Sequence, residues 1–232
     1  MSISTAGKQG AAGSPAALPA PAARLSGIAI RALDLVGAVA LLILLSPLLV
    51  AVAIAIKLDT RGPVVFWQRR LGRDLAPFRV AKFRTMSDGC AADSHRALVE
   101  QLICENESGD DAPKPMQKLR RDPRVTKVGV FLRRSSIDEL PQLWNVLRGE
   151  MSLVGPRPPI QYEVDNYPAR AFRRFAVRPG LTGLWQVRGR SLTTFAEMIE
   201  LDIEYIERRS LPLNLKILLL TVPTVIHGKG AE

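Results

Sequence analysis

An uncharged run of 22 residues, Leu35 to Ile56, constrains this chain more than any other feature. It reads LVGAVALLILLSPLLVAVAIAI. As an α-helix it would be about 33 Å long, which is enough to cross a bilayer. A secretory signal peptide fits poorly, because the run is longer than an ordinary apolar region of a signal and begins more than thirty residues into the chain. The run therefore predicts a membrane segment.

Basic residues flank this run on both sides. They are Arg24 and Arg31 before it, and Lys57, Arg61, Arg69, Arg70 and Arg73 after it. Positive flanks favour the cytoplasmic side, so the pattern predicts that both ends lie on that side. Pro47 removes one backbone donor in the middle of the run and favours a kink, and the Ser46 hydroxyl could partly satisfy the freed carbonyls. We predict a re-entrant helix–break–helix over residues 24–60, with a straight spanning helix as the alternative.

The rest of the chain divides into a tail and one larger region. Residues 1–23 are rich in Ala, Gly, Pro and Ser without apolar periodicity, which predicts a disordered tail. Residues 62–86 predict two strands with a turn near Arg73 and Asp74. Phe66 and Trp67 on the first strand suit a membrane headgroup interface or an ordinary core equally well. A helix is expected over residues 87–103 and a surface loop over residues 105–115.

Two apolar segments follow towards the C-terminus. SLTTFAEMIELDIEYIERR predicts an amphipathic helix capped by Thr193 or Thr194, with a core stripe of Phe195, Met198, Ile199, Asp202, Tyr205 and Ile206. The segment LPLNLKILLLTVPTVIHG suits a helix on a membrane surface, and a short buried helix is the alternative. The expected fold class is α+β: a mostly helical, membrane-associated domain with a small β-hairpin and amphipathic interfacial helices.

The excess of positive charge limits the classes of binding partner that we expect. The chain has 32 Lys and Arg against 22 Asp and Glu, which predicts attraction to nucleic acid, an anionic membrane or a phosphate-bearing substrate. No zinc-finger, RNP or helix-turn-helix signature accompanies this charge, and nucleic acid would leave the apolar run unexplained. Cys90 and Cys104 lack C-x-x-C spacing, and His95 and His227 lie far apart. The sequence thus encodes neither a disulfide framework nor a zinc site.

An adjacent acidic pair, Asp138 and Glu139, stands among arginines in the segment SSIDELPQLWNVLRG. Gly149 predicts that a helix ends near Arg148. Pro141 is tolerated only in the first turn, so both acids lie at the positive end of the helix dipole. Asp138 could be only a helix cap. However, a cap requires one acid and gives no reason for the surrounding arginines.

The alternative to capping is phosphoryl chemistry. A carboxylate kept ionised by cationic neighbours can attack phosphorus, and an adjacent carboxylate offers a hard oxygen ligand for Mg²⁺. Arginines can clamp phosphoryl oxygens. Two further segments, SLVGPRP and RPGLTGLWQVRGR, offer glycine backbone and arginines in the same way. The chain lacks a Walker A motif, a G-x-G-x-x-G fingerprint and H-E-x-x-H, which disfavours the nucleotide-binding folds built on those loops.

These motifs resemble those of a known family. KFRTM, DPRVTKVGVFLRR, SIDELPQLWNVLRGEMSLVGPRP and RPGLTGLWQVRGR occur in that order behind a hydrophobic segment with Ser-Pro. The chain is similar over about residues 25 to 230 to the bacterial sugar transferases, the monotopic polyprenyl-phosphate phosphoglycosyl transferases. It resembles their small exopolysaccharide-initiating form, although its long N-terminal tail is not part of the family pattern.

The resemblance implies a two-step exchange on polyprenyl (undecaprenyl) phosphate. The residue matching Asp138 would attack a UDP-sugar, such as UDP-glucose or UDP-galactose, and form an aspartyl-phosphosugar intermediate while UMP leaves. Glu139 would hold Mg²⁺. The expected substrate-binding residues are Lys82, Arg84, Arg133, Arg157, Arg188 and Arg190. The family's broken re-entrant helix matches Ser46 and Pro47.

The same resemblance implies a location and partners. Residues 61–232 would form a catalytic domain on the cytoplasmic face of the bacterial inner membrane, in contact with lipids. We expect no nucleic-acid partner, and a homodimer is a reasonable default. The alternative function is a catalytically inactive basic scaffold at the membrane surface for polysaccharide assembly, which would tolerate the loss of Asp138.

Overall fold

The computed structural model describes residues 20–87, 124–189 and 193–226. Residues 1–19 of the expected tail over 1–23 lie outside the described residues, whereas residues 20–23 belong to the first helix, so the tail ends earlier than predicted. The helix expected over 87–103, from residue 88 on, and the loop over 105–115 also lie outside the described residues. In chain order the elements are α1 (Ala20–Asp59), β1 (Val65–Leu71), η1 (Arg73–Leu75), β2 (Pro77–Phe83), α3 (Lys127–Ser135), η2 (Ile137–Gln142), α4 (Leu143–Arg148), β3 (Ser152–Val154), α5 (Gln161–Val164), η3 (Ala169–Ala176), β4 (Gly180–Thr182), α6 (Leu184–Arg188), α7 (Phe195–Glu207) and α8 (Leu211–Ile226). Helices dominate and the sheets are small, in keeping with the expected α+β class.

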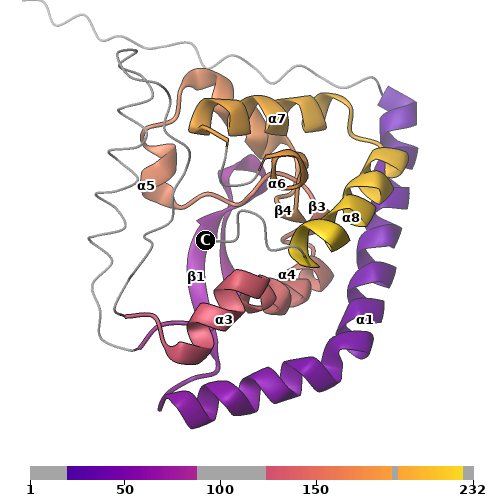
Figure 1. Cartoon of the computed structure of the whole chain (residues 1–232). Coiled ribbons are helices and arrows are strands. Elements are labelled where there is room, and N and C mark those ends of the chain that lie inside the picture. The colour runs from indigo at the N-terminus through magenta and orange to yellow at the C-terminus, as the bar shows by residue number, and fades with distance from the viewer. Residues whose placement is uncertain (1–19, 88–123, 190–192, 227–232) are drawn as a thin grey trace, which may run out of the picture.

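Helix α1 runs along one side of the molecule and then bends across its base (Figure 1). Pro47 lies inside the helix and has no N–H to donate to the carbonyl of Ile43, four residues earlier. The Ser46 hydroxyl donates to that carbonyl at 2.8 Å, which confirms the expected role of this serine. The helix continues through Ser46 and Pro47, so the structure shows a bent but continuous helix in place of the predicted helix–break–helix. Its re-entrant path in a bilayer stays a prediction.

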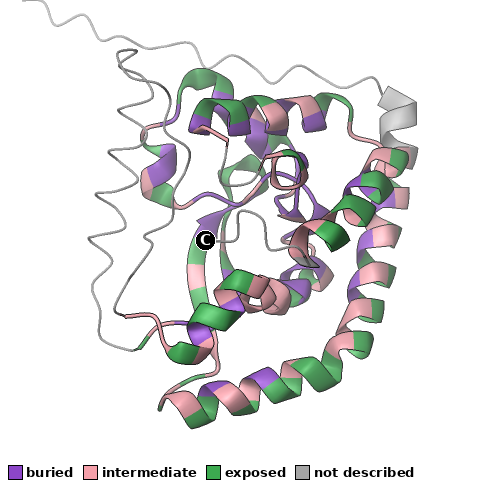
Figure 2. Cartoon of the chain, in the orientation of Figure 1, coloured by how far each residue is buried: buried purple, intermediate pink, exposed green. Residues whose placement is uncertain are grey.

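Only a narrow stripe of α1 is covered by protein. The stripe recurs every four residues, at Ile30, Asp34 and Ala38 and again at Val52 and Ile56. Many of the other large apolar side chains are exposed (Figure 2), among them Val36, Ile43, Leu44, Val50 and Leu58, whereas Leu41, Leu42 and Leu49 are partly buried. The helix is long and apolar enough to cross a membrane, and only 11% of its most apolar 18-residue window is buried. The core helix of a soluble protein would be mostly buried, so this exposure favours membrane association.

Polar contacts fasten the first part of α1 to the rest of the domain. The Arg31 guanidinium donates to the carbonyls of Val146 and Leu147 in α4 at 2.7 and 3.0 Å. The buried Asp34 carboxylate accepts from the Ser152 hydroxyl at 2.9 Å and from the Leu153 amide at 2.8 Å. The membrane helix and the β3 region therefore have a fixed relative position.

Strands β1 and β2 form the expected antiparallel hairpin, with Gln68 opposite Val80. Phe66 and Trp67 are 52% and 47% exposed, so the core alternative for them is wrong. The open edge of β2 is covered by the fully buried Asn145 of α4. Its amide accepts from the Ala81 N–H at 3.0 Å and donates to the Arg79 carbonyl at 2.7 Å, as a neighbouring strand would.

Strands β3 and β4 form a parallel pair that the sequence did not predict. Each has three residues, which is too short to show an alternating apolar pattern. The pair brings the two glycine-containing segments together, with the Gly155 N–H donating to Thr182 and the Gly180 N–H donating to Pro156 at 2.9 and 2.8 Å. A Cβ on Gly180 would lie 2.0 Å from the Gly155 nitrogen, so this close approach requires glycine.

The two C-terminal helices follow the expected pattern. Thr194 caps α7 through a reciprocal pair of hydrogen bonds with Glu197, and the whole predicted core stripe of α7 is buried. In α8, Asn214 and Ile217 are buried, whereas four large apolar residues are exposed: Leu215, Leu219, Leu220 and Val222. One face of α8 thus packs on the domain and the other suits a membrane surface.

Candidate active site

The acidic pair lies at a sharp junction between two helical segments. Helix α3 ends at Ser135, and the next residue, Ser136, has a φ of 57° that turns the chain into η2. Asp138 and Glu139 occupy the first turn of η2, as the position of Pro141 predicted. This turn is a 3₁₀ helix continuing into α4, because Pro141 has no N–H to donate to the Ile137 carbonyl.

The same junction tests the alternative that Asp138 is only a helix cap. The residue at the N-cap of η2 is Ser136, and its side chain makes no capping hydrogen bond. Asp138 lies two residues further on, inside the turn and half-buried. Its interpretation as an N-cap is therefore wrong, and its place next to Glu139 needs another explanation.

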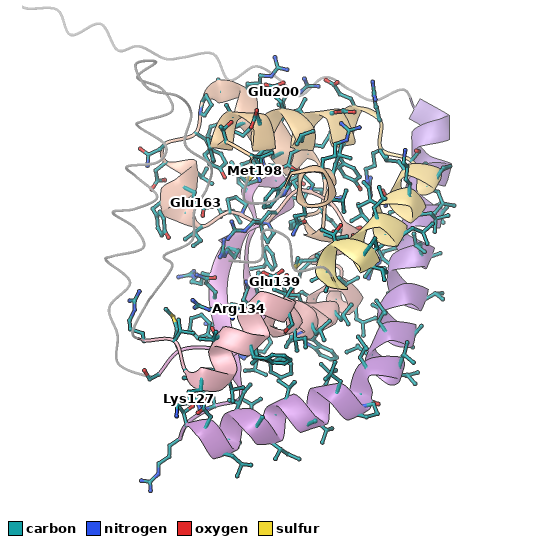
Figure 3. The ribbon with its side chains drawn as sticks, in the orientation of Figure 1. Lys127, Arg134, Glu139, Glu163, Met198 and Glu200 are labelled. Carbon is teal, nitrogen blue, oxygen red and sulfur yellow. The ribbon has the colours of Figure 1, made fainter. Side chains whose placement is uncertain are left out.

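An ion pair joins Lys82 of β2 to Glu139 of η2. The Lys82 ammonium lies 2.7 Å from the Glu139 carboxylate, and both side chains are mostly buried, with 21% and 32% exposed. Figure 3 shows Glu139 near the middle of the molecule, between α3 and the α5–α7 region. The structure thus brings together two of the predicted site residues that are 57 positions apart in the chain.

Arg133 and Arg84 make hydrogen bonds to other parts of the protein. The Arg133 Nε donates to the Thr85 hydroxyl at 3.0 Å. The buried Arg84 guanidinium donates to the carbonyls of Thr60 and Arg61 at 2.9 and 2.7 Å, just beyond the end of α1. Arg84 therefore ties the membrane helix to the hairpin that carries Lys82. A substrate contact for either arginine stays a prediction.

The remaining predicted arginines lie in the C-terminal half. Arg157 is half-buried on the turn after β3. Arg188 is exposed at the end of α6, and its guanidinium lies 2.8 Å from the Glu204 carboxylate of α7. Arg190 lies outside the described residues. Their roles in substrate binding stay predictions.

Arg70 is a member of the site that sequence reasoning missed. It is 6% exposed, and burial together with the charge of Arg157 lowers the pKa of its guanidinium to about 10. The charges of Glu163 and Glu139 act in the opposite direction on this pKa. Arg70 is thus buried on the hairpin that carries Lys82, and its guanidinium donates to the Pro158 carbonyl, next to Arg157 in the chain.

A signal for Arg70 was present in the sequence. Gln68 and Arg70 are two residues apart on a strand, so both point to one face of the hairpin. Phe66 shares this face and lies directly opposite Lys82. Arg70 was interpreted only as a flanking charge of the membrane segment, which hid its position on the same face as the site lysine.

The site suits Mg²⁺ only with the help of a ligand. Among the residues that the structure describes, no group of three or more His, Cys, Asp or Glu side chains is placed to hold a metal. Mg²⁺ is commonly bound by one or two carboxylates plus substrate phosphates. The adjacent carboxylates of Asp138 and Glu139 fit this incomplete type of site, which a diphosphate would complete.

Comparison with known proteins identifies relatives over almost the whole chain. The family model described as bacterial sugar transferase matches residues 25–228. The exopolysaccharide production protein ExoY of Rhizobium meliloti is 38% identical over 207 residues, which cover 89% of this chain and 89% of that protein.

Two longer relatives align with the same part of the chain. A UDP-glucose:undecaprenyl-phosphate glucose-1-phosphate transferase of Caulobacter vibrioides is 44% identical over 209 residues, covering 87% of this chain and 71% of that protein. The galactosyl transferase CpsE of Streptococcus agalactiae is 42% identical over 206 residues, covering 88% of this chain and 44% of that protein. The chain thus spans most of the ExoY protein and less than half of CpsE.

Proposed function

The chain belongs to the bacterial sugar transferase family and is a phosphoglycosyl transferase, and we propose that it transfers a phosphosugar from a UDP-sugar to polyprenyl phosphate. The products would be UMP and polyprenyl-diphosphate-sugar. The observation that supports this best is the Lys82–Glu139 ion pair, with Asp138 next to Glu139 in the chain and Arg70 of the same hairpin bonded to the turn that carries Arg157. An acidic pair surrounded by cations suits a diphosphate substrate better than a neutral one.

The proposed reaction has two displacements at one phosphorus. A carboxylate oxygen of Asp138 attacks the phosphorus that carries the sugar, and the bond to the bridging oxygen breaks as UMP leaves with the electron pair. An oxygen of polyprenyl phosphate then attacks the same phosphorus and displaces the Asp138 carboxylate. The carboxylate is regenerated, so the enzyme returns to its starting state.

The residues around Asp138 have separate tasks in this proposal. Arg157 would bind the donor diphosphate, and Lys82 would neutralise charge on its oxygens as the leaving group departs. Glu139 would hold Mg²⁺, which supplies further charge neutralisation on the diphosphate. Glu139 is also fixed by Lys82 at 2.7 Å, so its position is set before a substrate arrives.

The names of the relatives indicate candidate donor sugars and a candidate pathway. The names of similar proteins include glucose-1-phosphate transferases from Caulobacter vibrioides and Escherichia coli and a UDP-galactose-lipid carrier transferase from Erwinia amylovora. The ExoY relatives are named for exopolysaccharide production. We therefore propose UDP-glucose or UDP-galactose as the donor, and the first membrane step of exopolysaccharide synthesis as the role.

A direct test is UMP release by the purified protein from a panel of UDP-sugars, with polyprenyl phosphate and Mg²⁺ present. UDP-glucose or UDP-galactose should give the fastest release, and removal of Mg²⁺ with a chelator should stop it. A properly folded protein that releases no UMP from any member of the panel would contradict the proposal. That outcome would favour a basic membrane-surface scaffold.

We also propose that α1 enters and leaves the inner membrane on its cytoplasmic side. The bend in a continuous helix and the apolar surface on both of its halves support this path. Single cysteines in place of Ser26 and Ser87, in a chain without Cys90 and Cys104, would flank the segment. Both should react with an impermeant thiol reagent only from the cytoplasmic side. Labelling from opposite sides would indicate a straight span.

A further inference from the structure

The turn that presents Arg157 has few donors of its own. Residues 156–159 read Pro-Arg-Pro-Pro, and three of these four residues have no backbone N–H. The turn must therefore be held mainly through its carbonyl oxygens. All three carbonyls from Arg157 to Pro159 accept hydrogen bonds from other parts of the chain.

Two arginines and one strand amide supply these hydrogen bonds. The Arg174 guanidinium of η3 donates to the Arg157 carbonyl at 3.2 Å. The Arg70 guanidinium donates to the next carbonyl, of Pro158, at 2.9 Å. The Leu71 N–H of β1 donates to the carbonyl of Pro159 at 3.0 Å. The turn is thus bonded on one side to η3, at Arg157, and on the other side to the end of β1, at Pro158 and Pro159.

Arg70 is itself held in a fixed orientation. Its Nε and one terminal nitrogen donate to the Gln68 side-chain oxygen at 3.1 and 2.7 Å, and its other terminal nitrogen makes the bond to Pro158. The guanidinium is buried, so it faces protein on nearly all sides. The planar guanidinium has two fixed partners, so it holds the turn in a defined position relative to β1. A lysine ammonium on its flexible side chain would hold the turn less firmly.

The hydrogen bond from Arg70 to the turn connects that turn with the candidate active site. Arg70 lies on the same hairpin as Lys82, the partner of Glu139. One rigid hairpin therefore fixes Glu139 through Lys82 and the Arg157 turn through Arg70. Burial and the charge of Arg157 both disfavour the charged form of Arg70, so Arg70 carries an electrostatic cost. An apolar residue at position 70 would avoid this cost.

We propose that Arg70 is a positioning residue for donor binding, which holds the Pro158 carbonyl and thereby presents the Arg157 guanidinium to the donor diphosphate. The proposal rests on the proposed function, because it assumes that a diphosphate binds beside Glu139. Arg70 acts through Arg157 and does not touch the donor itself. Its loss should therefore affect donor binding more than the rate of the chemical steps.

The experiment compares Arg70→Gln, Arg157→Gln and the double variant in purified, membrane-mimetic-bound protein. Each single change should raise the KM for the UDP-sugar about tenfold and leave kcat within about threefold, which corresponds to one lost contact to the donor. The KM of the double variant should be no higher than that of the more impaired single variant, because both changes remove the same contact to the donor. Binding of UDP with Mg²⁺, measured by calorimetry, should weaken by the same factor.

Three variants make the comparison specific. Arg69→Gln is the matched control, because Arg69 is the exposed neighbour on β1 and loses the same charge. It should leave the donor KM within about twofold. Arg70→Lys keeps one donor for the Pro158 carbonyl and should recover part of the lost affinity. Gln68→Ala releases one side of the guanidinium with less disturbance, and it should raise the donor KM about threefold even if Arg70→Gln does not fold.

Several results would overturn the proposal. They are a fall in kcat with an unchanged donor KM, additive effects in the double variant, or equal effects of Arg69→Gln and Arg70→Gln. A donor KM that is unchanged in Gln68→Ala would do the same. Failure of the proposed function would be seen earlier, since the unmodified protein would then release no UMP.

Discussion

Asp138→Asn should abolish UMP release from UDP-sugar in the presence of polyprenyl phosphate and Mg²⁺, with a loss of at least about 1,000-fold. The amide has nearly the same shape as the carboxylate, so the first turn of η2 should be retained. It is a poor nucleophile towards phosphorus, so no covalent intermediate should form. The measurement is the initial rate of UMP release, with the thermal unfolding of the variant followed in parallel.

A second measurement tests the covalent intermediate directly. If the first displacement is reversible and needs no acceptor, the unmodified protein should exchange labelled UMP into UDP-sugar without polyprenyl phosphate. Asp138→Asn should show no exchange. Asp165→Asn is the control, because Asp165 is an exposed aspartate at the end of α5 and loses the same charge. Full activity of Asp138→Asn, or no exchange by the active unmodified protein, would refute the mechanism.

Glu139→Gln should also be severely impaired, but in a different way. The change removes the charge that pairs with Lys82 and weakens a hard oxygen ligand for Mg²⁺. The nucleophile remains, so slow exchange should persist and should need more Mg²⁺ than the unmodified protein. An equal Mg²⁺ requirement in both proteins would mean that Glu139 does not hold the metal.

The local features of the fold that the sequence predicted are those with strong signals. The apolar run, the turn near Arg73, the cap at Thr194 and the helix end at Gly149 each follow from residues within a few positions of one another. Proline at position 141 was enough to place both acids in the first turn. Such signals depend on the local backbone, and tertiary packing left them unchanged.

The features that the sequence did not predict depend on contacts between distant segments. Strands β3 and β4 pair because Gly155 and Gly180 allow close approach, and neither strand shows a pattern of its own. Arg84 donates to a carbonyl just beyond the end of α1, and Arg70 donates to a carbonyl on the turn after β3. A charged residue gives no sign in the sequence of which distant carbonyl it will meet.

The largest expected effect on stability lies away from the reaction, in the ion pair between Arg174 and Asp202. Their side chains are 3% and 1% exposed, and the charged atoms lie 2.8 Å apart. Arg174 also donates to the Tyr167 hydroxyl at 2.7 Å and lies over its ring. Asp202→Ala should leave the guanidinium buried without its carboxylate and lower the free energy of unfolding by about 3 to 5 kcal/mol.

In thermal unfolding of the detergent-solubilised protein, this loss corresponds to a midpoint lowered by roughly 10 °C. Glu200→Ala is the matched control on the same helix, because Glu200 pairs with Arg170 at 2.6 Å but both side chains are more than half exposed. Its effect should stay below about 1 kcal/mol. Equal midpoints for the two variants would show that the buried pair contributes no more than a surface pair.

The pH dependence provides an independent check on the same pair. Burial raises the pKa of Asp202 from 3.8 to about 6, although the charge of Arg174 acts to lower it. The folded state therefore binds this proton more tightly than the unfolded state. The stability from this group is fully present below about pH 4 and is lost as the pH rises through about 6. The difference in unfolding midpoint between the unmodified protein and Asp202→Ala should accordingly be larger at pH 5 than at pH 7. A difference that grows with pH would mean that Arg174 holds the pKa of Asp202 below its usual value.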